Sequence, residues 1–277
     1  MMKIVKVLTA TLLATTLLCA EDASKKVESF LKEEFSQNQR ISALEVKVSD
    51  VVPLADLKGW SAYILNVSAT LKDKPAERVK QKMIWFSNGE IITKELVKMS
   101  SGENLIESVK PDFKANFYSK ANLIYGDANA KHKVAIFSDP LCPFCRGFVP
   151  EAINEMKKEP KKFAIYYYHY PLERLHPAAV TLTQAAAAAE HKGIKDVVLK
   201  LYKVEINEKE SDVIKILAAF NKAVGSKITP EDLKHPAVLK QIAFDKEVAA
   251  SLMVGGTPTL YLDGKIDNTK KKYKSVK

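Results

Sequence analysis

The sequence predicts two domains: an α+β N-terminal domain, and an α/β domain that carries an inserted helical subdomain. Three observations predict this fold class. One amphipathic helix followed only by β-rich runs fills residues 22–100, and residues 133–168 have the pattern strand, helix, strand. A helical stretch at about 177–252 then precedes a last short strand. The chain's 277 residues suffice for one large domain or two modest ones.

The first 20 residues have the pattern of a cleavable signal peptide. A basic start is followed by an apolar stretch from Val7 to Leu18, and the small Ala20 precedes a charged segment. About twelve apolar residues are too few to span a bilayer, which disfavours a membrane anchor. Cys19 would suggest a lipoprotein, an alternative that the bulky residue before it disfavours. We therefore expect cleavage after Ala20 and export.

The chain is basic, with a formal net charge of +10 at pH 7. The excess of lysine is spread through the expected helices and through a tail from Lys270 to Lys274. Such a tail could bind nucleic acid, but in an exported protein a solvated terminus is the simpler interpretation. We therefore expect no nucleic-acid partner.

The N-terminal domain, residues 21–100, is expected to pack one helix against a β meander. Apolar residues recur at helical spacing within residues 22–37. The β-rich runs that follow are 44–48, 62–67 and 79–86. Asn88-Gly89 after them predicts a hairpin turn. The domain contains neither cysteine nor histidine, so we expect a structural role, with an edge strand that pairs with a second copy.

A linker and a second domain are expected to follow. Residues 101–126 are predicted to be the linker because Ser101-Gly102 opens the segment and Pro111 interrupts it. The second domain, residues 127–277, should begin with a βαβ unit. Its parts are a strand at 133–138, a helix at about 143–158 and a strand at 163–168.

A helical insertion at about 177–252 interrupts the second domain. Its apolar periodicity predicts four helices, at 177–191, 197–202, 213–224 and 238–252. A short strand at 259–262 comes after them.

Cys142 and Cys145 stand two residues apart at the expected turn from strand to helix. A structural disulfide, half of a zinc site and a redox couple are all compatible with this spacing. A loop of two residues removes little entropy from the unfolded chain, which disfavours a structural disulfide. No second cysteine pair or close histidine pair supplies further zinc ligands, so we expect no metal. The favoured interpretation is a redox-active disulfide, Cys142–Cys145, with no other cofactor.

The position at a helix start predicts different roles for the two cysteines. Free backbone N–H groups and the helix dipole at the first turn stabilise a thiolate on Cys142, the expected nucleophile, whose sulfur should be exposed. Cys145, one turn further into the helix, should be less exposed and act as the resolving thiol. Pro143 and Phe144 supply little hydrogen bonding and are expected to tune the couple to moderate oxidising power.

Three parts of the sequence, Phe137 to Cys145, Pro150 and Gly256-Thr257-Pro258, together resemble the thioredoxin superfamily. Within it they are most similar to the periplasmic DsbC/DsbG-type disulfide isomerases and their DsbA-like relatives. The resemblance implies a kink of the active-site helix at Pro150. It also implies that Thr257 and a cis Pro258 hold a client strand beside the cysteines. By the same resemblance, the N-terminal domain is a dimerisation module and the protein a homodimer.

The resemblance further implies a thiol:disulfide interchange protein in the periplasm. Its partners would be exported client proteins that contain cysteines and a membrane redox partner that recycles it. A threonine before the cis proline is usual in the isomerase branch, whereas Pro143 is shared with oxidising members and with DsbG, so the dipeptide between the cysteines does not settle the direction. Disulfide isomerase or reductase activity is the favoured expectation. The alternatives are a DsbA-like dithiol oxidase and a holdase chaperone that uses an apolar cleft.

Two features depart from the family pattern. Only about thirteen residues follow Gly264, too few for a last strand and a closing helix. We therefore expect one face of the sheet to be less covered, unless another element takes that place. An acidic residue beneath the second cysteine is also not evident, because Val134 to Phe137 is wholly apolar. Proton transfer from Cys145 is then expected to rely on water, on Lys133 or on a group elsewhere.

Overall fold

The computed structural model describes residues 5–276, and for residues 5–20, Lys74 and Glu77 it describes the backbone alone. The predicted signal peptide, residues 1–20, therefore lies outside the described side chains, and its first four residues lie outside the described backbone. The chain divides into two compact units, Met1–Lys110 and Pro111–Lys277. Within the described residues, no helix is both long and apolar enough to cross a bilayer.

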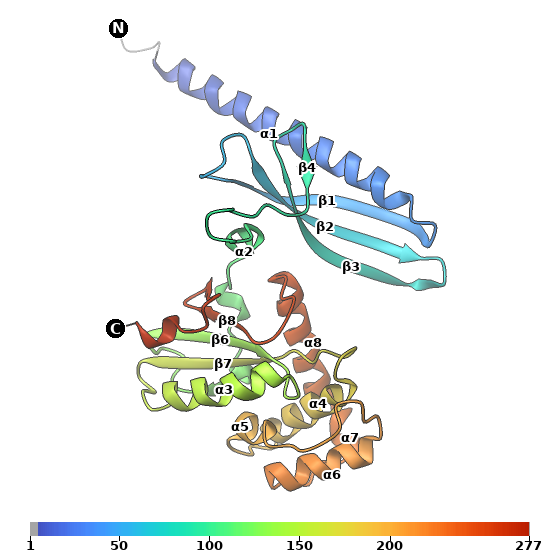
Figure 1. Ribbon diagram of the computed structural model, residues 1–277, viewed down its shortest axis with the longest axis vertical. Coiled ribbons are helices and arrows are strands. Elements are labelled where there is room, and N and C mark those ends of the chain that lie inside the picture. Colours follow the sequence, from blue (N-terminus) through green and yellow to red (C-terminus); the bar gives the residue numbers. More distant parts are fainter. Residues whose placement is uncertain (1–4, 277) are drawn as a thin grey trace. The chain divides into compact units, whose positions relative to one another are not determined.

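In the first unit, helix α1 (Val5–Ser36) packs on one face of a four-stranded antiparallel sheet (Figure 1). In sheet order the strands are β1 (Ile41–Pro53), β2 (Ser61–Leu71), β3 (Lys74–Ser87) and β4 (Ile92–Thr93). Val27 and Leu31 of the helix are buried in one apolar core with Leu65 and Trp85 of the sheet. One helix against a meander is the arrangement that the sequence predicts.

The turn between β3 and β4 lies at the predicted Asn88-Gly89. Gly89 has a φ of +94°, a backbone conformation that glycine adopts without strain. The Asn88 side-chain oxygen accepts hydrogen bonds from the backbone N–H groups of Glu90 and Ile91. These two residues therefore reverse the chain so that β4 can pair with β3.

The segment predicted to be a linker, residues 101–126, is divided between the two units. Its first part, with the short helix α2 (Ile106–Val109), belongs to the first unit. From Pro111 onward it belongs to the second unit, where Phe113 is buried and β5 (Leu123–Tyr125) is an edge strand. A strand of three residues and single aromatic anchors have no periodicity that a sequence can show. The second unit thus begins at Pro111 rather than at residue 127.

The second unit contains a five-stranded mixed sheet in the order β5-β7-β6-β8-β9. Strands β6 (His132–Ser138) and β7 (Phe163–His169) are parallel, with helix α3 (Pro143–Met156) between them in the chain, which confirms the predicted βαβ unit. Strand β8 (Thr259–Leu262) is antiparallel to β6 and pairs with β9 (Lys265–Ile266). Pro150 lies inside α3, which continues past it to Met156.

Both faces of this sheet are covered. On one face, Ile136 of β6 and Tyr167 of β7 lie in an apolar core with both cysteines and with residues of α3. On the other face, Phe137 and Tyr168 pack in a core with Phe113 and residues of the long helix before β8. Burial of successive residues on opposite faces explains why the β6 sequence is a continuous apolar run.

Five helices between β7 and β8 form the inserted subdomain (Figure 1). They are α4 (Pro177–His191), α5 (Val197–Leu201), α6 (Val213–Val224), α7 (Pro230–Leu233) and α8 (Pro236–Ser251). The one that the sequence did not predict, α7, is a single turn. Helix α8 contributes to two cores, because Val238 packs among the inserted helices while Val248 and Ala249 pack on the sheet.

The C-terminal tail covers the sheet face beside α3. Asp267 is buried after β9 and accepts hydrogen bonds from the backbone N–H groups of Thr269 and Lys272. The 3₁₀ turn η3 (Lys272–Lys274) follows, and its Tyr273 is buried in the α3 core and donates a hydrogen bond to Glu155 at 2.7 Å. Within the described residues, the tail thus covers this face of the sheet chiefly through one buried side chain, Tyr273.

Candidate functional site

Cys142 and Cys145 lie where β6 delivers the chain to the first turn of α3. Cys142 is the N-cap residue of that helix, with φ −65° and ψ 124°, and Pro143 is its first residue. A proline is well tolerated there because the first N–H groups of a helix have no partner within it. Both cysteines are free thiols. The structure thus has the predicted pair at the predicted helix start.

The two sulfurs are both shielded, against the expectation of an exposed Cys142. Cys145 is fully buried, as predicted, and Cys142 is only 5% exposed. The Cys142 Sγ lies 3.7 Å from the carbonyl oxygen of Thr257, so the loop before β8 covers it. Phe144, between the two cysteines, is 78% exposed. An exposed aromatic ring therefore stands next to a recessed sulfur.

The loop that covers Cys142 contains the predicted cis proline. The Thr257-Pro258 peptide bond is cis, and Pro258 is buried. Pairing of Phe137 with Thr259 places this loop beside the end of β6, where the active turn begins. The structure therefore brings Thr257 and Pro258 together with the cysteines, while their role in holding a client strand stays a prediction.

Asp139 is a residue of this site that sequence reasoning missed. Its buried carboxylate accepts hydrogen bonds from the N–H groups of Leu141 at 2.7 Å and Cys142 at 3.2 Å. It also accepts from Leu172 N at 2.7 Å and lies 3.0 Å from His176 Nδ1. The carboxylate thus ties the turn that carries Cys142 to the loop between β7 and α4. An aspartate directly after a buried strand is the signal that could have found it.

Arg146 holds the same turn to the inserted subdomain. Its guanidinium donates hydrogen bonds to the carbonyl oxygens of Pro140, at 2.9 Å, and of Val204. The planar guanidinium offers several donors in a fixed geometry, which suits it to bridging two backbone segments. Two charged side chains, Asp139 and Arg146, therefore fix the position of Cys142 through hydrogen bonds to backbone groups.

Hydroxyl groups surround the buried Cys145. Burial raises the pKa of its thiol to about 11, and the nearby hydroxyls of Ser138 and Thr257 offset part of that rise. Within the described residues, the Thr257 Oγ1 is buried and makes no hydrogen bond of ordinary length. The side chains that chiefly act on this thiol are thus hydroxyls and not a carboxylate.

The rest of the described side chains show no metal centre. Nowhere among them do three histidine, cysteine, aspartate or glutamate residues gather as ligands. The two free thiols, with their different surroundings, can perform thiol–disulfide exchange.

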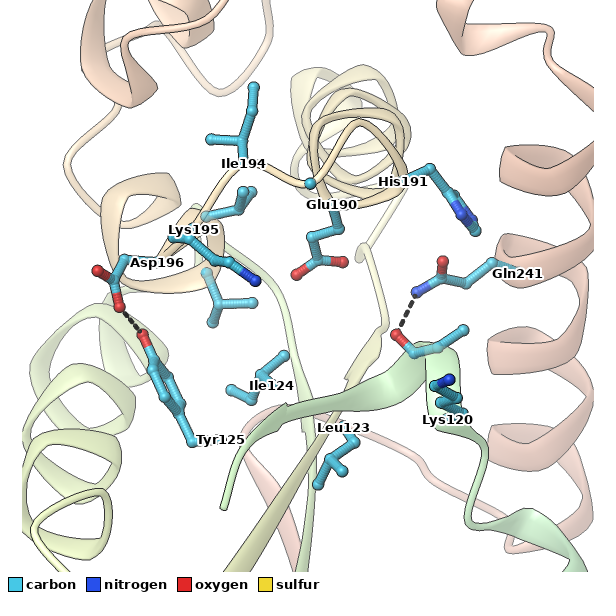
Figure 2. A pocket seen from close by; sticks show the side chains of 14 residues that line it. Lys120, Leu123, Ile124, Tyr125, Glu190, His191, Ile194, Lys195, Asp196 and Gln241 are labelled. Carbon is cyan, nitrogen blue, oxygen red and sulfur yellow. Dashed lines mark hydrogen bonds between the residues drawn. The ribbon is translucent and has the colours of Figure 1, made fainter. Parts of the chain in front are cut away.

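A separate pocket of about 390 Å³ lies near β5 and the end of α4, and neither cysteine lines it (Figure 2). Figure 2 shows the side chains of Glu190 and Lys195 directed into this pocket. Other polar groups around it pair with each other, since Tyr125 donates a hydrogen bond to Asp196 at 2.5 Å. The pair of free thiols lies elsewhere, so the cysteine turn is the candidate site.

Comparison with known proteins relates the second unit to one family. Residues 118–277 match the family model described as Thioredoxin. The chain is 27% identical over 144 residues to the Na(+)/H(+) antiporter NhaA 1 of Mycolicibacterium gilvum (strain PYR-GCK), a match that covers 51% of this chain and 23% of that protein. A protein of the same name from Mycolicibacterium vanbaalenii is 26% identical over 165 residues, which are 59% of this chain and 25% of that protein. The chain therefore spans about a quarter of the length of these curated relatives.

Three solved structures are similar to this chain at low sequence identity. BdbD from Bacillus subtilis, in its oxidised form, is 18% identical with a TM-score of 0.47, covering 60% of this chain and 92% of that chain. A thioredoxin-like oxidoreductase from Silicibacter pomeroyi DSS-3 is 20% identical with a TM-score of 0.44, covering 54% and 84%. The catalytic domain of Proteus mirabilis ScsC is 19% identical with a TM-score of 0.41, covering 57% and 89%.

Proposed function

This chain belongs to the thioredoxin family, and from that membership and its pair of free thiols we propose that it is a protein thiol:disulfide oxidoreductase. One observation carries the proposal. Cys142 caps the start of α3 beside the cis Thr257-Pro258 loop, and Cys145 is buried one turn further along the same helix. The helix start favours a thiolate on the first cysteine, and the spacing lets the second reach it.

The proposed reaction begins with attack by the Cys142 thiolate on one sulfur of a client disulfide. A mixed disulfide forms, and the other client sulfur leaves as a thiolate. In isomerisation, another client thiolate then attacks the client sulfur and releases Cys142. In reduction, Cys145 attacks the Cys142 sulfur instead, so that the two cysteines become a disulfide and the client leaves reduced. Oxidation of a client runs the second route in reverse.

The proposed type of activity is that of the DsbC/DsbG proteins. We propose an isomerase or reductase that acts on exported cysteine-containing proteins in the periplasm, pairs through its first unit and is recycled by a membrane redox partner. The signal-peptide pattern supports export, and Thr257 before the cis proline supports the isomerase direction. The separate β-rich first unit, with strand β1 at the edge of its sheet, supports self-association.

The test is recovery of activity by a model client whose disulfides have been scrambled, such as scrambled ribonuclease in a glutathione buffer. The wild-type protein should restore activity in catalytic amounts, and Cys142→Ser should restore none. Cys145→Ser should retain part of the isomerisation and accumulate mixed disulfides with the client. Full activity of Cys142→Ser would contradict the proposal, and so would a wild type that only prevents client aggregation, the result expected of a holdase chaperone.

The direction of the reaction is tested in the producing cell. Acid trapping followed by alkylation with a maleimide of high mass separates the reduced pair from the disulfide. A mostly reduced pair is the result expected of an isomerase. A fully oxidised pair would overturn the DsbC/DsbG assignment in favour of a dithiol oxidase.

A further inference from the structure

Three buried hydroxyl groups form a cluster beneath the resolving cysteine. Ser138 ends β6, Tyr167 lies on the neighbouring strand β7, and Tyr202 follows α5 in the inserted subdomain. The Ser138 Oγ lies 2.6 Å from the Tyr202 hydroxyl, which lies 2.9 Å from the Tyr167 hydroxyl. The three residues are 0%, 7% and 1% exposed in the order Ser138, Tyr202, Tyr167. Solvent therefore supplies little competition for these hydrogen bonds.

One of the three hydroxyl protons in this cluster is not used in a hydrogen bond within it. That proton is available for a hydrogen bond to Cys145. Cys145, Tyr167 and Tyr202 share one otherwise apolar core, and the Ser138 hydroxyl lowers the pKa of the Cys145 thiol against the effect of burial. Each hydroxyl carries one proton, and the two hydrogen bonds within the cluster use two of the three. The order Tyr167 to Tyr202 to Ser138 leaves the Ser138 proton free to point at the sulfur.

We propose that Tyr167, Tyr202 and Ser138 form a directed hydroxyl chain that donates a hydrogen bond to the Cys145 thiolate and so speeds its attack on the mixed disulfide. This inference rests on the proposed function. Ser138 contacts the reacting sulfur, whereas Tyr202 and Tyr167 are positioning residues that act through it. The sequence shows no acidic residue beneath the second cysteine. The three hydroxyl groups are proposed to act on Cys145 in place of such an acid.

The reacting step conserves its electrons and its proton. Cys145 sulfur forms a bond to Cys142 sulfur while the bond from Cys142 to the client breaks. The client sulfur leaves with the electron pair and takes up the proton that Cys145 gives up, so the cysteine pair is oxidised and the client reduced.

The hydroxyls act as donors and not as bases. Burial raises the pKa of Tyr167 and of Tyr202 above the ordinary tyrosine value, so both keep their protons near neutral pH. Burial also raises the pKa of the Cys145 thiol above its ordinary value, so the thiolate that attacks is a minor species near neutral pH. A donor that favours the thiolate therefore changes the rate of the resolving step directly.

The experiment separates the two cysteines in time. The reduced full-length protein is mixed with an equimolar amount of Ellman's reagent in a stopped-flow instrument. Cys142 releases one coloured thiolate in the first phase, and Cys145 displaces the second from Cys142 in a later phase. The rate of the second phase as a function of pH reports the Cys145 thiolate.

We expect Ser138→Ala and Tyr202→Phe to move the pH profile of the second phase up by about one unit and to slow that phase about three- to fourfold near neutral pH, because the thiolate of the less acidic thiol is also the better nucleophile. The first phase should change less than about twofold. Because Tyr202 acts through Ser138, the double variant should be no slower than Ser138→Ala alone.

Tyr168→Phe is the matched control. Its hydroxyl is also part of a buried tyrosine and donates a hydrogen bond at 2.6 Å to the Phe117 carbonyl, but its ring packs on the opposite face of the sheet. It should leave both phases unchanged. Tyr202→Phe keeps the aromatic ring and its packing, which makes it the variant to trust if Ser138→Ala loses native circular dichroism.

Two results overturn the inference. One is a second-phase rate within twofold of wild type in both Ser138→Ala and Tyr202→Phe. The other is equal slowing of both phases in these variants, which indicates general damage to the site. A wild type that releases only one coloured thiolate for each Ellman's reagent consumed contradicts the proposed dithiol couple instead. The two failures are therefore distinguishable.

Discussion

Asp245 is a buried acid remote in sequence from the cysteines. Its carboxylate on α8 accepts hydrogen bonds from Asn122 Nδ2 at 2.6 Å and from the backbone N–H of His169 at 2.9 Å. Burial raises its pKa to about 7, with Glu190 adding to the rise, although His169 and the Asn122 hydrogen bond oppose it. This residue therefore titrates near neutral pH in the folded protein.

Asp245→Asn should flatten the pH dependence of stability. An aspartate in an unfolded chain titrates near about pH 3.9, so between about pH 4 and 7 the native state holds a proton that the unfolded state has lost. Its contribution to stability is therefore greatest below about pH 4 and is lost as the pH rises to about 7. We expect the wild type to lose on the order of a few kcal/mol more than Asp245→Asn across that range, measured by urea unfolding at several pH values.

The asparagine variant is expected to fold because its neighbour can adapt. Within the described residues, Asn122 Oδ1 is buried and lacks a hydrogen-bond partner, so the Asn122 amide can turn and accept from the new side chain, although it then loses its hydrogen bond to the Tyr167 carbonyl. Asp127→Asn is the control, since Asp127 is exposed. Parallel stability curves for wild type and Asp245→Asn would contradict the argument.

The sequence predicted that the cysteine pair lies at a helix start and that the proline after Thr257 is cis, and the structure has both features. Two cysteines at a helix start and a proline after Gly256-Thr257 can be recognised from the local sequence alone. Ser138 and Tyr202 cannot, because they are 64 residues apart and meet only when the insertion folds. The exposure of Cys142 was wrongly predicted for the same reason, since the loop that covers it comes 115 residues later in the chain.

At the scale of elements, one carboxylate joins the turn after β6 to the loop after β7. Asp139 satisfies the N–H groups of Leu141 and Cys142 on one side and of Leu172 on the other. Parallel strands end at the same edge of a sheet, so a single short side chain can span both turns. The position of the nucleophile thus depends on two separate connections.

Asp139→Ala should lower the free energy of unfolding by about 3–5 kcal/mol, because it leaves the N–H groups of Leu141 and Leu172 without their acceptor and removes the nearer of two carboxylates from His176. Asp139→Asn should cost less, since one acceptor oxygen remains. The measurement is urea unfolding of the reduced protein. Asp127→Ala is the matched control at less than about 1 kcal/mol, because its hydrogen bond to Asn129 N lies in an exposed loop. Equal losses in the two alanine variants would show that Asp139 does not hold the turn.

At the scale of the whole molecule, the chain consists of two compact units, each with its own core. The sequence predicted the βαβ unit and the helical insertion because long apolar periods mark them. It placed the start of the second unit too late, since Phe113 and Asn122 act through distant partners. Phe113 packs on Tyr168 with ring centroids 5.5 Å apart, and Asn122 bonds Asp245.

A fragment of residues 111–277 should therefore fold with a single cooperative transition and keep both phases of the thiol reaction. A fragment of residues 127–277 loses an edge strand, a buried phenylalanine and the Asn122 amide. We expect it to be less stable by at least about 3 kcal/mol, measured by urea unfolding of both fragments. Equal stability would mean that residues 111–126 are a linker after all.

The recessed position of Cys142 has a consequence for which proteins can react. A sulfur only 5% exposed, behind the loop before β8 and beside the projecting Phe144, cannot touch a disulfide that is locked inside a rigid globule. A segment has to be extended and free of its own structure to reach it. We therefore expect the protein to react with unfolded or partly folded clients and not with correctly folded ones. The burial of the Cys142 sulfur would then select clients by their folding state.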